Sequence, residues 1–150
     1  MVKQMWRLKV NLYINMSSVR LKNINKSFGS INALSNLNLE IKDGEFFVLL
    51  GPTGAGKTTT LRIISGLEMP DSGNIYFNEE KVNNVQPAFR NTSYVFQQYS
   101  LYPHYSVYDN LAFPLRSPLR KSDKKTIDDR VREIARLLKI ENKLNNKATQ

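Results

Sequence analysis

Residues 51–58 combine residue types and a spacing that could bind a chain of phosphates. They read Gly51-Pro52-Thr53-Gly54-Ala55-Gly56-Lys57-Thr58, which matches the pattern G-x-x-x-x-G-K-[ST]. Glycine permits a tight turn and lets backbone N–H groups approach phosphate oxygens, where a Cβ would intrude. The lysine ammonium can neutralise terminal phosphates, and the threonine hydroxyl that follows can reach Mg²⁺. The segment is therefore a candidate phosphate-binding loop, whereas a Gly-rich turn that binds nothing is the simpler alternative.

The flanking residues predict the strand and the helix between which such a loop lies. Residues 46–50 are a continuous apolar run, and we expect a central strand that is buried on both faces. After the loop, Leu61, Ile64 and Leu67 recur at helical spacing, with Gly66 placed as a C-cap. The unpaired N–H groups at the start of this helix would point at the anion. We expect the ligand to contact Gly51, Pro52, Thr53, Gly54, Ala55, Gly56, Lys57, Thr58 and Thr59.

The composition agrees with a protein of a reducing, aqueous compartment but does not establish one. The chain has 150 residues, of which 41% are hydrophobic, and it has no cysteine for a disulfide or a thiolate metal site. The longest apolar stretches are far shorter than the roughly 20 residues of a membrane-spanning helix. Lys3, Arg7 and Lys9 interrupt the first segment, so we expect no signal peptide and a cytoplasmic location.

The net charge of +9 is concentrated in the C-terminal third of the chain. A basic segment could contact nucleic acid or an anionic membrane surface, but it is also typical of a solvated helix face. Because no aromatic stacking platform accompanies these charges, we expect no nucleic-acid partner.

Local patterns predict the remaining elements. Residues 1–15 alternate between apolar and polar types, as in an edge strand or a leader before Met16, and we treat 1–18 as an N-terminal extension. Turns are expected at 42–45 and 71–73. Further strands are expected at 19–28, 34–42, 75–77 and 92–96, the last ending at Gln97.

Two helices are expected near the C-terminus. Ser106 and Asp109 form a capping box for the first helix, which ends between Pro114 and Pro118. Ser122 is the expected cap of a longer helix. Its predicted apolar stripe is Ile127, Val131, Ile134, Ala135 and Leu138, and its predicted ion pairs are Asp128 with Arg132 and Glu133 with Arg136.

The chain resembles the nucleotide-binding subunit of ATP-binding cassette (ABC) transporters, especially importers of the maltose, glycerol-phosphate and polyamine type. The resemblance covers residues 19–150. It rests on Lys26-Ser27-Phe28-Gly29, the phosphate loop, residues 67–73 and, most specifically, residues 94–104 (Tyr-Val-Phe-Gln-Gln-Tyr-Ser-Leu-Tyr-Pro-His). It implies an α/β fold of the P-loop NTPase class: a truncated ABC-type ATPase core with an antiparallel β subdomain and part of the helical subdomain, at about 99–150.

The resemblance also implies roles for single residues. Phe28 would stack on adenine; stacking alone does not discriminate among bases, so the preference for ATP is itself a family expectation. Gln97 would reach Mg²⁺ and the attacking water, so Lys57 and Gln97 are the implied catalytic residues, and Thr58 and Gln97 the implied metal ligands. A core phenylalanine and an ordinary loop glutamine are the alternatives.

The family's Leu-Tyr-Pro-His stretch lies near its transmembrane permease. We therefore expect His104 to have no catalytic role, since no carboxylate lies near it in sequence. The residues Tyr99, Leu101, Tyr102 and Tyr105 suit either a docking groove for a partner helix or a local core. The implied partners are this permease and a second ATP-binding subunit, on the cytoplasmic face of the membrane.

The family pattern stops before its Leu-Ser-Gly-Gly-Gln signature, and the acidic Mg²⁺ motif and the switch histidine are absent too. From this we expect weak binding of Mg-ATP, negligible turnover and aggregation-prone strand edges in the isolated chain. The alternatives are a non-catalytic nucleotide-binding module that docks on a membrane partner, a gene fragment without function, and a P-loop enzyme of another group.

Overall fold

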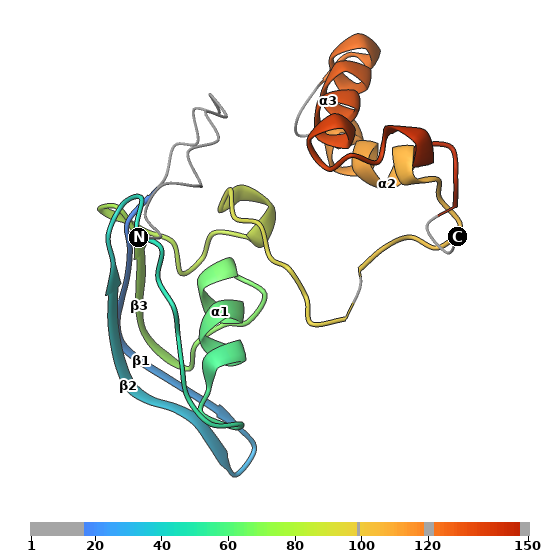
Figure 1. Cartoon of the computed structure of the whole chain (residues 1–150). Helices are drawn as coiled ribbons and strands as arrows, with labels where there is room; N and C mark the ends of the chain where they lie inside the picture. The colour runs from blue at the N-terminus through green and yellow to red at the C-terminus, as the bar shows by residue number, and fades with distance from the viewer. Residues whose placement is uncertain (1–16, 99, 119–121, 148–150) are drawn as a thin grey trace, which may run out of the picture. The chain divides into compact units, whose positions relative to one another are not determined.

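A computed structural model describes residues 17–98, 100–118 and 122–147. These residues form two compact units, the first ending at Tyr94 and the second beginning at Val95 (Figure 1). The expected strand at residues 1–15 and the expected partner residue Tyr99 lie outside the described residues. No helix within the described ranges has the length and apolar character needed to cross a bilayer.

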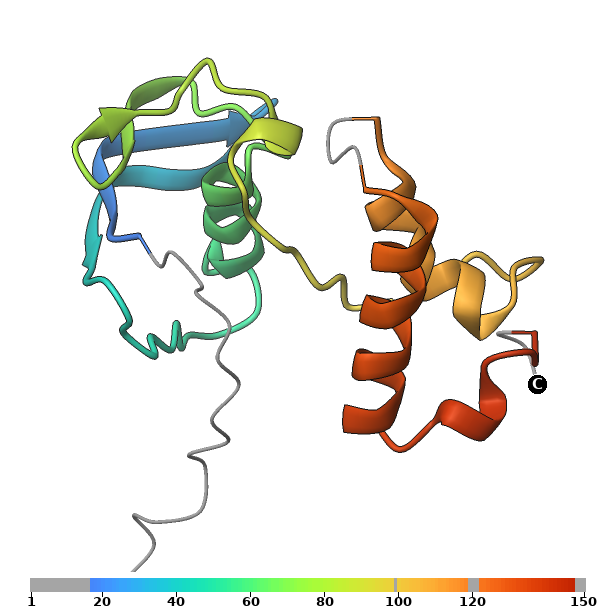
Figure 2. The same ribbon diagram turned by 90° about the horizontal axis from the view of Figure 1, so that it is seen from above.

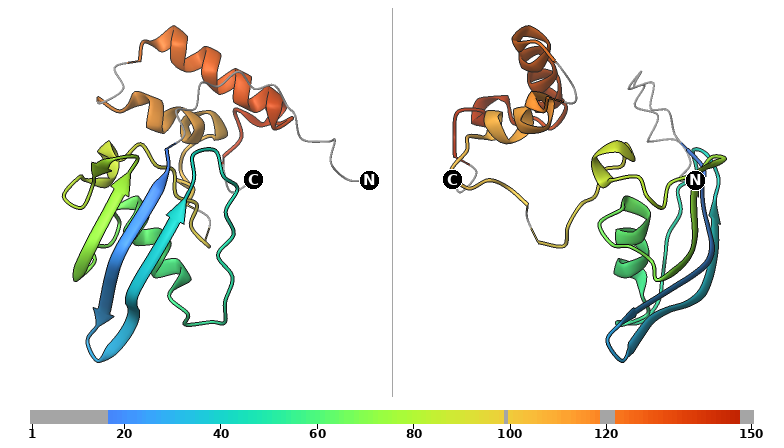
Figure 3. Two further views of the ribbon diagram at one scale, coloured as in Figure 1. Left: turned by 90° about the vertical axis from the view of Figure 1, so that its left-hand side faces the viewer. Right: turned by 180° about the vertical axis from the view of Figure 1, so that it is seen from behind.

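The first unit contains a four-stranded antiparallel sheet in the order β2-β1-β3-β4. The strands are β1 (Val19–Phe28), β2 (Ile31–Ile41), β3 (Ser72–Phe77) and β4 (Glu80–Lys81). A tight turn at Gly29, which has φ +58°, joins β1 to β2 and places Phe28 opposite Ile31. Figure 3 shows the two long strands side by side. The predicted strand at 19–28 is confirmed, and those at 34–42 and 75–77 are confirmed with shifted ends.

Helix α1 (Lys57–Ser65) covers one face of this sheet (Figure 1). The predicted C-cap is confirmed, because Gly66 has φ +79° and its N–H donates to the carbonyl of Ile63. The predicted apolar stripe is shifted: Ile63 is fully buried against the sheet, whereas Leu61 is half exposed. The core consists of Leu21, Ile24, Leu34, Ile63, Ile75 and Val82.

Two predicted strands are absent from the structure. Residues 46–50 have no strand pairing, and Phe46 is 93% exposed, so the expected buried central strand is wrong. Residues 92–96 are likewise irregular, and Val95 is 91% exposed. An apolar run becomes a buried strand only when neighbouring strands accept its backbone hydrogen bonds, and within the described ranges no strand pairs with either segment.

The second unit is helical. It contains α2 (Val107–Ala112), a 3₁₀ turn (Phe113–Arg116), α3 (Lys124–Leu137) and a second 3₁₀ turn (Glu141–Lys143), as Figure 2 shows from above. The capping box of α2 is confirmed, since Ser106 Oγ accepts from the N–H of Asp109 and donates to its carboxylate. The core consists of Ala112, Ile127, Val131, Ala135 and Leu144.

Helix α3 corrects two sequence-based predictions, its N-cap and its apolar stripe. Its N-cap is Asp123, not Ser122, because the Asp123 carboxylate accepts from the N–H of Thr126 at 2.9 Å. Two members of the predicted apolar stripe, Ile134 and Leu138, are exposed, because the helix packs on the face centred on Val131.

The sequence predicted one of two ion pairs in α3 correctly. Asp128 and Arg132 pair at 2.8 Å as expected. Glu133 pairs with Arg130 at 2.9 Å instead of with Arg136. Both partners are available to Glu133 on the same exposed face, so the sequence alone does not decide between them.

Candidate functional site

Residues 51–56 form a tight turn that leads directly into α1. The N–H of Ala55 donates to the carbonyl of Pro52 at 3.2 Å, which closes the turn. Gly54 has φ +85° and Gly56 has φ +79°, a region of backbone conformation that favours glycine at both positions.

The backbone donors of this loop are available to a ligand. The N–H groups of Gly54, Gly56, Lys57 and Thr58 donate to no acceptor within the described residues. No side chain caps the start of α1, where Gly56 is the N-cap. The unpaired N–H groups of a helix N-terminus and its positive dipole end attract anions. The geometry therefore fits the phosphate site that the motif predicts.

The ammonium of Lys57 folds back over the loop. Its Nζ donates to the carbonyl oxygens of Gly51 at 2.8 Å and Pro52 at 2.7 Å. The next side chain, that of Thr58, belongs to an exposed residue in the first turn of α1. A bound polyphosphate would compete with the two carbonyls for the lysine ammonium, which is a charged donor in an otherwise neutral loop.

The β1–β2 hairpin carries an aromatic ring to the same end of the first unit. A Cβ on Gly56 would stand 2.6 Å from the carbonyl oxygen of Ala33, so the loop lies directly against β2. In the ladder, Leu34 pairs with Lys26 and Ile31 pairs with Phe28. Figures 1 and 3 show the hairpin end and the loop at the same end of the first unit. Phe28 is 47% exposed, so the structure does not bury it as a core residue.

Sequence reasoning missed a charge cluster beside Phe28. Lys26 Nζ lies 5.1 Å from the centroid of the Phe28 ring, 2.8 Å from a Glu68 carboxylate oxygen and 3.4 Å from an Asp71 carboxylate oxygen. The hydrogen bond to Glu68 is the largest cause of a raised Lys26 pKa. The N–H of Ser27 donates to Asp71 at 2.7 Å, and this bond is the main reason that the pKa of Asp71 is lowered. The available signal was the spacing of Lys26 and Phe28, which places both on one face of a strand.

The other expected catalytic residue lies in the second unit. Gln97 is exposed in an irregular segment, and its contact with the phosphate loop would join the two units, so that contact stays a prediction. His104 is exposed in a turn. Within the described ranges, no group of three or more His, Asp or Glu residues could hold a metal ion.

Two of the four expected docking residues, Tyr102 and Tyr105, form an exposed aromatic cluster with Phe113. The ring of Tyr102 lies 4.5 Å from that of Phe113 and 5.3 Å from that of Tyr105, centroid to centroid. Asn110 of α2 fixes the loop, because its side chain accepts from the N–H of Tyr102 and donates to the Tyr102 carbonyl. All three aromatic residues remain more than 40% exposed, so the cluster is not a closed local core.

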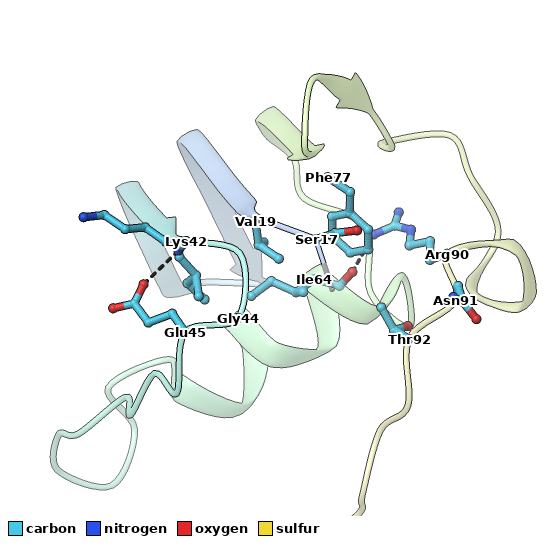
Figure 4. Close-up of a pocket in the computed structure, with 11 residues that line it drawn as sticks. Ser17, Val19, Lys42, Gly44, Glu45, Ile64, Phe77, Arg90, Asn91 and Thr92 are labelled. Atoms are coloured by element: carbon cyan, nitrogen blue, oxygen red, sulfur yellow. Dashed lines mark hydrogen bonds between the residues drawn. The ribbon is translucent and has the colours of Figure 1, made fainter. Parts of the chain in front are cut away.

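A pocket of about 310 Å³ lies at the opposite end of α1 (Figure 4). Ile64, Phe77 and Arg90 line it, and no residue of the phosphate loop does. Lys57 and Ile64 are about 10 Å apart along the helix axis at 1.5 Å per residue. We therefore assign the chemistry to the loop and not to this pocket.

Arg90 binds the C-terminal end of α1. Its guanidinium donates to the carbonyl oxygens of Ile63, Ile64, Val85 and Asn83 at 2.8–3.2 Å, and only 5% of the residue is exposed. Burial lowers the pKa of this guanidinium. Two of the four acceptors are the last carbonyls of the helix, so the positive charge also complements the negative end of the helix dipole.

Comparison with known proteins identifies relatives of this chain. The family model for ABC transporters matches residues 34–150. The trehalose/maltose import ATP-binding protein MalK of Thermococcus litoralis is 51% identical over 88% of this chain and 37% of that protein. The spermidine/putrescine import ATP-binding protein PotA of Fusobacterium nucleatum is 45% identical over 88% of this chain and 35% of that protein.

A third relative, the sn-glycerol-3-phosphate import ATP-binding protein UgpC of Brucella abortus, is 48% identical over 90% of this chain and 38% of that protein. The chain thus spans a little over a third of the length of these curated relatives.

Solved structures of ATP-binding cassettes share the fold. A dimeric cassette in a post-hydrolysis state, bound to ADP and Pi, is 33% identical with a TM-score of 0.74, over 88% of this chain and 62% of that chain. A nucleotide-free cassette from an ABC transporter is 26% identical with a TM-score of 0.73, over 89% of this chain and 58% of that chain. The architecture is therefore that of a P-loop NTPase cassette, as the sequence motifs predicted.

Proposed function

Because the chain belongs to the ABC transporter family, we propose that it binds ATP as a portion of an importer's ATP-binding subunit. One observation carries this proposal: the backbone N–H groups of Gly54, Gly56, Lys57 and Thr58 have no acceptor within the described residues, and their loop packs against β2, the strand that pairs with β1 and its exposed ring at Phe28. A nucleotide needs both features, an anion cradle for its phosphates and an apolar surface for its base.

Each residue of the site has a role in this proposal. The N–H groups of Gly54, Gly56, Lys57 and Thr58 hold the phosphates, and the Lys57 ammonium leaves its two carbonyl acceptors to bridge the terminal phosphates. Phe28 stacks on the base. The transport reaction of a whole importer subunit, in which ATP hydrolysis drives solute import, belongs to the same proposal.

The residues also fit a magnesium ion. Thr58 is exposed and directly follows the phosphate-binding lysine, so its hydroxyl is the proposed protein ligand in the first unit; Gln97 is a second ligand only through the family resemblance. The ion would supply charge neutralisation to the terminal phosphates. Because Mg²⁺ keeps several water or phosphate ligands, two protein ligands suffice, and a cluster of carboxylates in this chain is not required.

We place the subunit on the cytoplasmic face of a membrane, bound to a transmembrane permease and paired with a second ATP-binding subunit. The support is threefold: the relatives are named import ATP-binding proteins, one structural neighbour is a dimeric cassette, and the Tyr102–Tyr105–Phe113 cluster leaves apolar rings exposed. Exposed aromatic groups of this kind favour contact with a partner helix.

Titration calorimetry of the 150-residue chain with Mg-ATP tests the nucleotide proposal. Lys57→Ala should weaken ATP binding about tenfold or more, because a hydrogen bond to a charged group contributes about 1.5–3 kcal/mol. Lys125→Ala, which removes an exposed lysine of α3, is the matched control and should change nothing. Equal affinity of the unaltered chain and Lys57→Ala, with unchanged melting temperatures, would refute the proposal.

A further inference from the structure

Phe28 presents its ring to an ammonium group on the same strand. Lys26 Nζ lies 5.1 Å from the ring centroid, within the distance of about 6 Å at which a cation is attracted to the ring quadrupole. Within the described residues, no second cation and no aromatic ring lies against Phe28. The ring therefore has one charged neighbour and remains almost half exposed.

The ammonium is held in this position by more than the ring. Glu68 and Asp71, which follow α1 in the chain, bind it at 2.8 and 3.4 Å, and only 12% of the Lys26 side chain is exposed. Asp71 also accepts the N–H of Ser27, the residue between Lys26 and Phe28. The strand end that carries the ring is thus bound to the segment after α1 through both its backbone and its charge.

From this geometry we infer that Lys26 is a positioning residue for the nucleotide base, acting through Phe28. The inference rests on the proposed function, in which Phe28 stacks on the base. The ammonium fixes the orientation of the ring before the ligand arrives, so less conformational entropy is lost on binding. It also draws electron density from the ring, which favours an electron-rich purine on the exposed side.

We expect Lys26 to affect binding of the base and not binding of the phosphates. Removal of the Lys26 charge leaves Glu68 and Asp71 without their cation, but these side chains are 22% and 50% exposed, so water and salt screen the change in charge at the phosphates. The phosphates depend instead on Lys57 and the loop N–H groups. A ligand with phosphates but no base should therefore be insensitive to Lys26.

The test compares ATP with inorganic tripolyphosphate, both titrated into the full chain. Lys26→Met keeps most of the aliphatic stem and removes the charge; it should weaken ATP binding about two- to fivefold and leave tripolyphosphate binding unchanged. Lys26→Arg restores a cation that can lie over the ring, and it should restore ATP affinity. In a Phe28→Leu background, Lys26→Met should have no further effect.

Lys22→Met is the matched control. Lys22 lies on the same strand, and its Nζ is 5.7 Å from the Tyr76 ring. This substitution also removes a lysine from an aromatic ring, so it should leave the affinities for both ligands unchanged. If Lys26→Met does not fold, Lys26→Gln replaces it, since a neutral amide can still donate to Glu68.

The outcomes separate the two proposals. If the unaltered chain binds ATP and Lys57→Ala abolishes binding, but Lys26→Met weakens both ligands equally or neither, the inference on Lys26 is wrong and the proposed function stands. The inference also fails if Lys26→Met weakens ATP binding as strongly in the Phe28→Leu background. If the unaltered chain binds neither ligand, both proposals fail.

Discussion

Gly56 lies so close to Leu34 that a Cβ on the glycine would stand 2.5 Å from Leu34 Cδ2. This contact joins the phosphate loop to β2, the strand that pairs with Lys26 and Phe28, so a hairpin far from the loop in sequence packs against it. The glycine is therefore needed for packing as well as for its positive φ.

Substitution of Gly56 should reduce the stability of the fold much more than substitution of Gly54, another glycine of the motif. Gly56→Ala should cost about 2–4 kcal/mol of stability, because strain at φ +79° adds to a clash with Leu34 and the Ala33 carbonyl. Gly54→Ala meets no atom within 4 Å and should cost about 1 kcal/mol. Urea unfolding of the two variants measures the difference, and equal losses would show that the contact with Leu34 is unimportant.

Removal of the buried guanidinium should destabilise the first unit. Arg90→Met leaves four carbonyl acceptors without their donor, and we expect a loss of about 3 kcal/mol or more in urea unfolding. Arg130→Met, which removes an arginine from an exposed pair with Glu133, should cost less than about 0.5 kcal/mol. Similar losses in the two variants would contradict the role assigned to Arg90.

The start of α3 offers a direct comparison of neighbouring residues. Asp123→Ala removes the acceptor of the Thr126 N–H and should cost about 1 kcal/mol. Ser122→Ala should stay within about 0.5 kcal/mol of the unaltered chain, because the structure gives this serine no capping bond. Thermal unfolding followed by far-UV circular dichroism measures both losses of stability. A larger loss for Ser122→Ala than for Asp123→Ala would show that Ser122 is the N-cap, as the sequence predicted.

The lowered pKa of Asp71 predicts that its carboxylate stabilises the fold less at acidic pH. Its pKa is lowered from 3.8, first by the Ser27 N–H and then by Lys26, so its carboxylate stabilises the folded state above pH 3.8. That contribution is lost as the pH falls through the lower pKa of the folded state. Asp71→Asn should therefore be less stable than the unaltered chain near pH 6, with a difference that shrinks toward pH 2 in urea titrations. A difference independent of pH would exclude the charge as its cause.

Local signals allowed much of the fold to be predicted. The phosphate motif, the Gly66 cap and the Ser106 capping box depend on a few adjacent residues, and the structure forms all three. The apolar residues Val19, Leu21 and Ile24 predicted β1 for the same reason. Such features need no knowledge of distant partners.

Apart from the cap and one ion pair of α3, the wrong predictions concern features that depend on distant partners. The apolar runs at 46–50 and 92–96 have strand-like composition, but no described strand pairs with them. The buried face of α1 is centred on Ile63 because the sheet covers that face, and helical periodicity alone does not choose it. The contacts of Lys26 with Glu68 and Asp71 join residues more than forty positions apart, so strand spacing could have indicated only the face that Lys26 shares with Phe28.

The central claim is that the backbone N–H groups at the start of α1 bind the phosphates of a nucleotide. The most direct measurement is a titration of the ¹⁵N-labelled chain with Mg-ATP, followed by the amide resonances of Gly54, Gly56, Lys57 and Thr58. The account predicts large, saturable shifts at these four residues and little change at Tyr76 in β3. Unshifted loop amides at ATP concentrations that saturate binding elsewhere in the chain would contradict it.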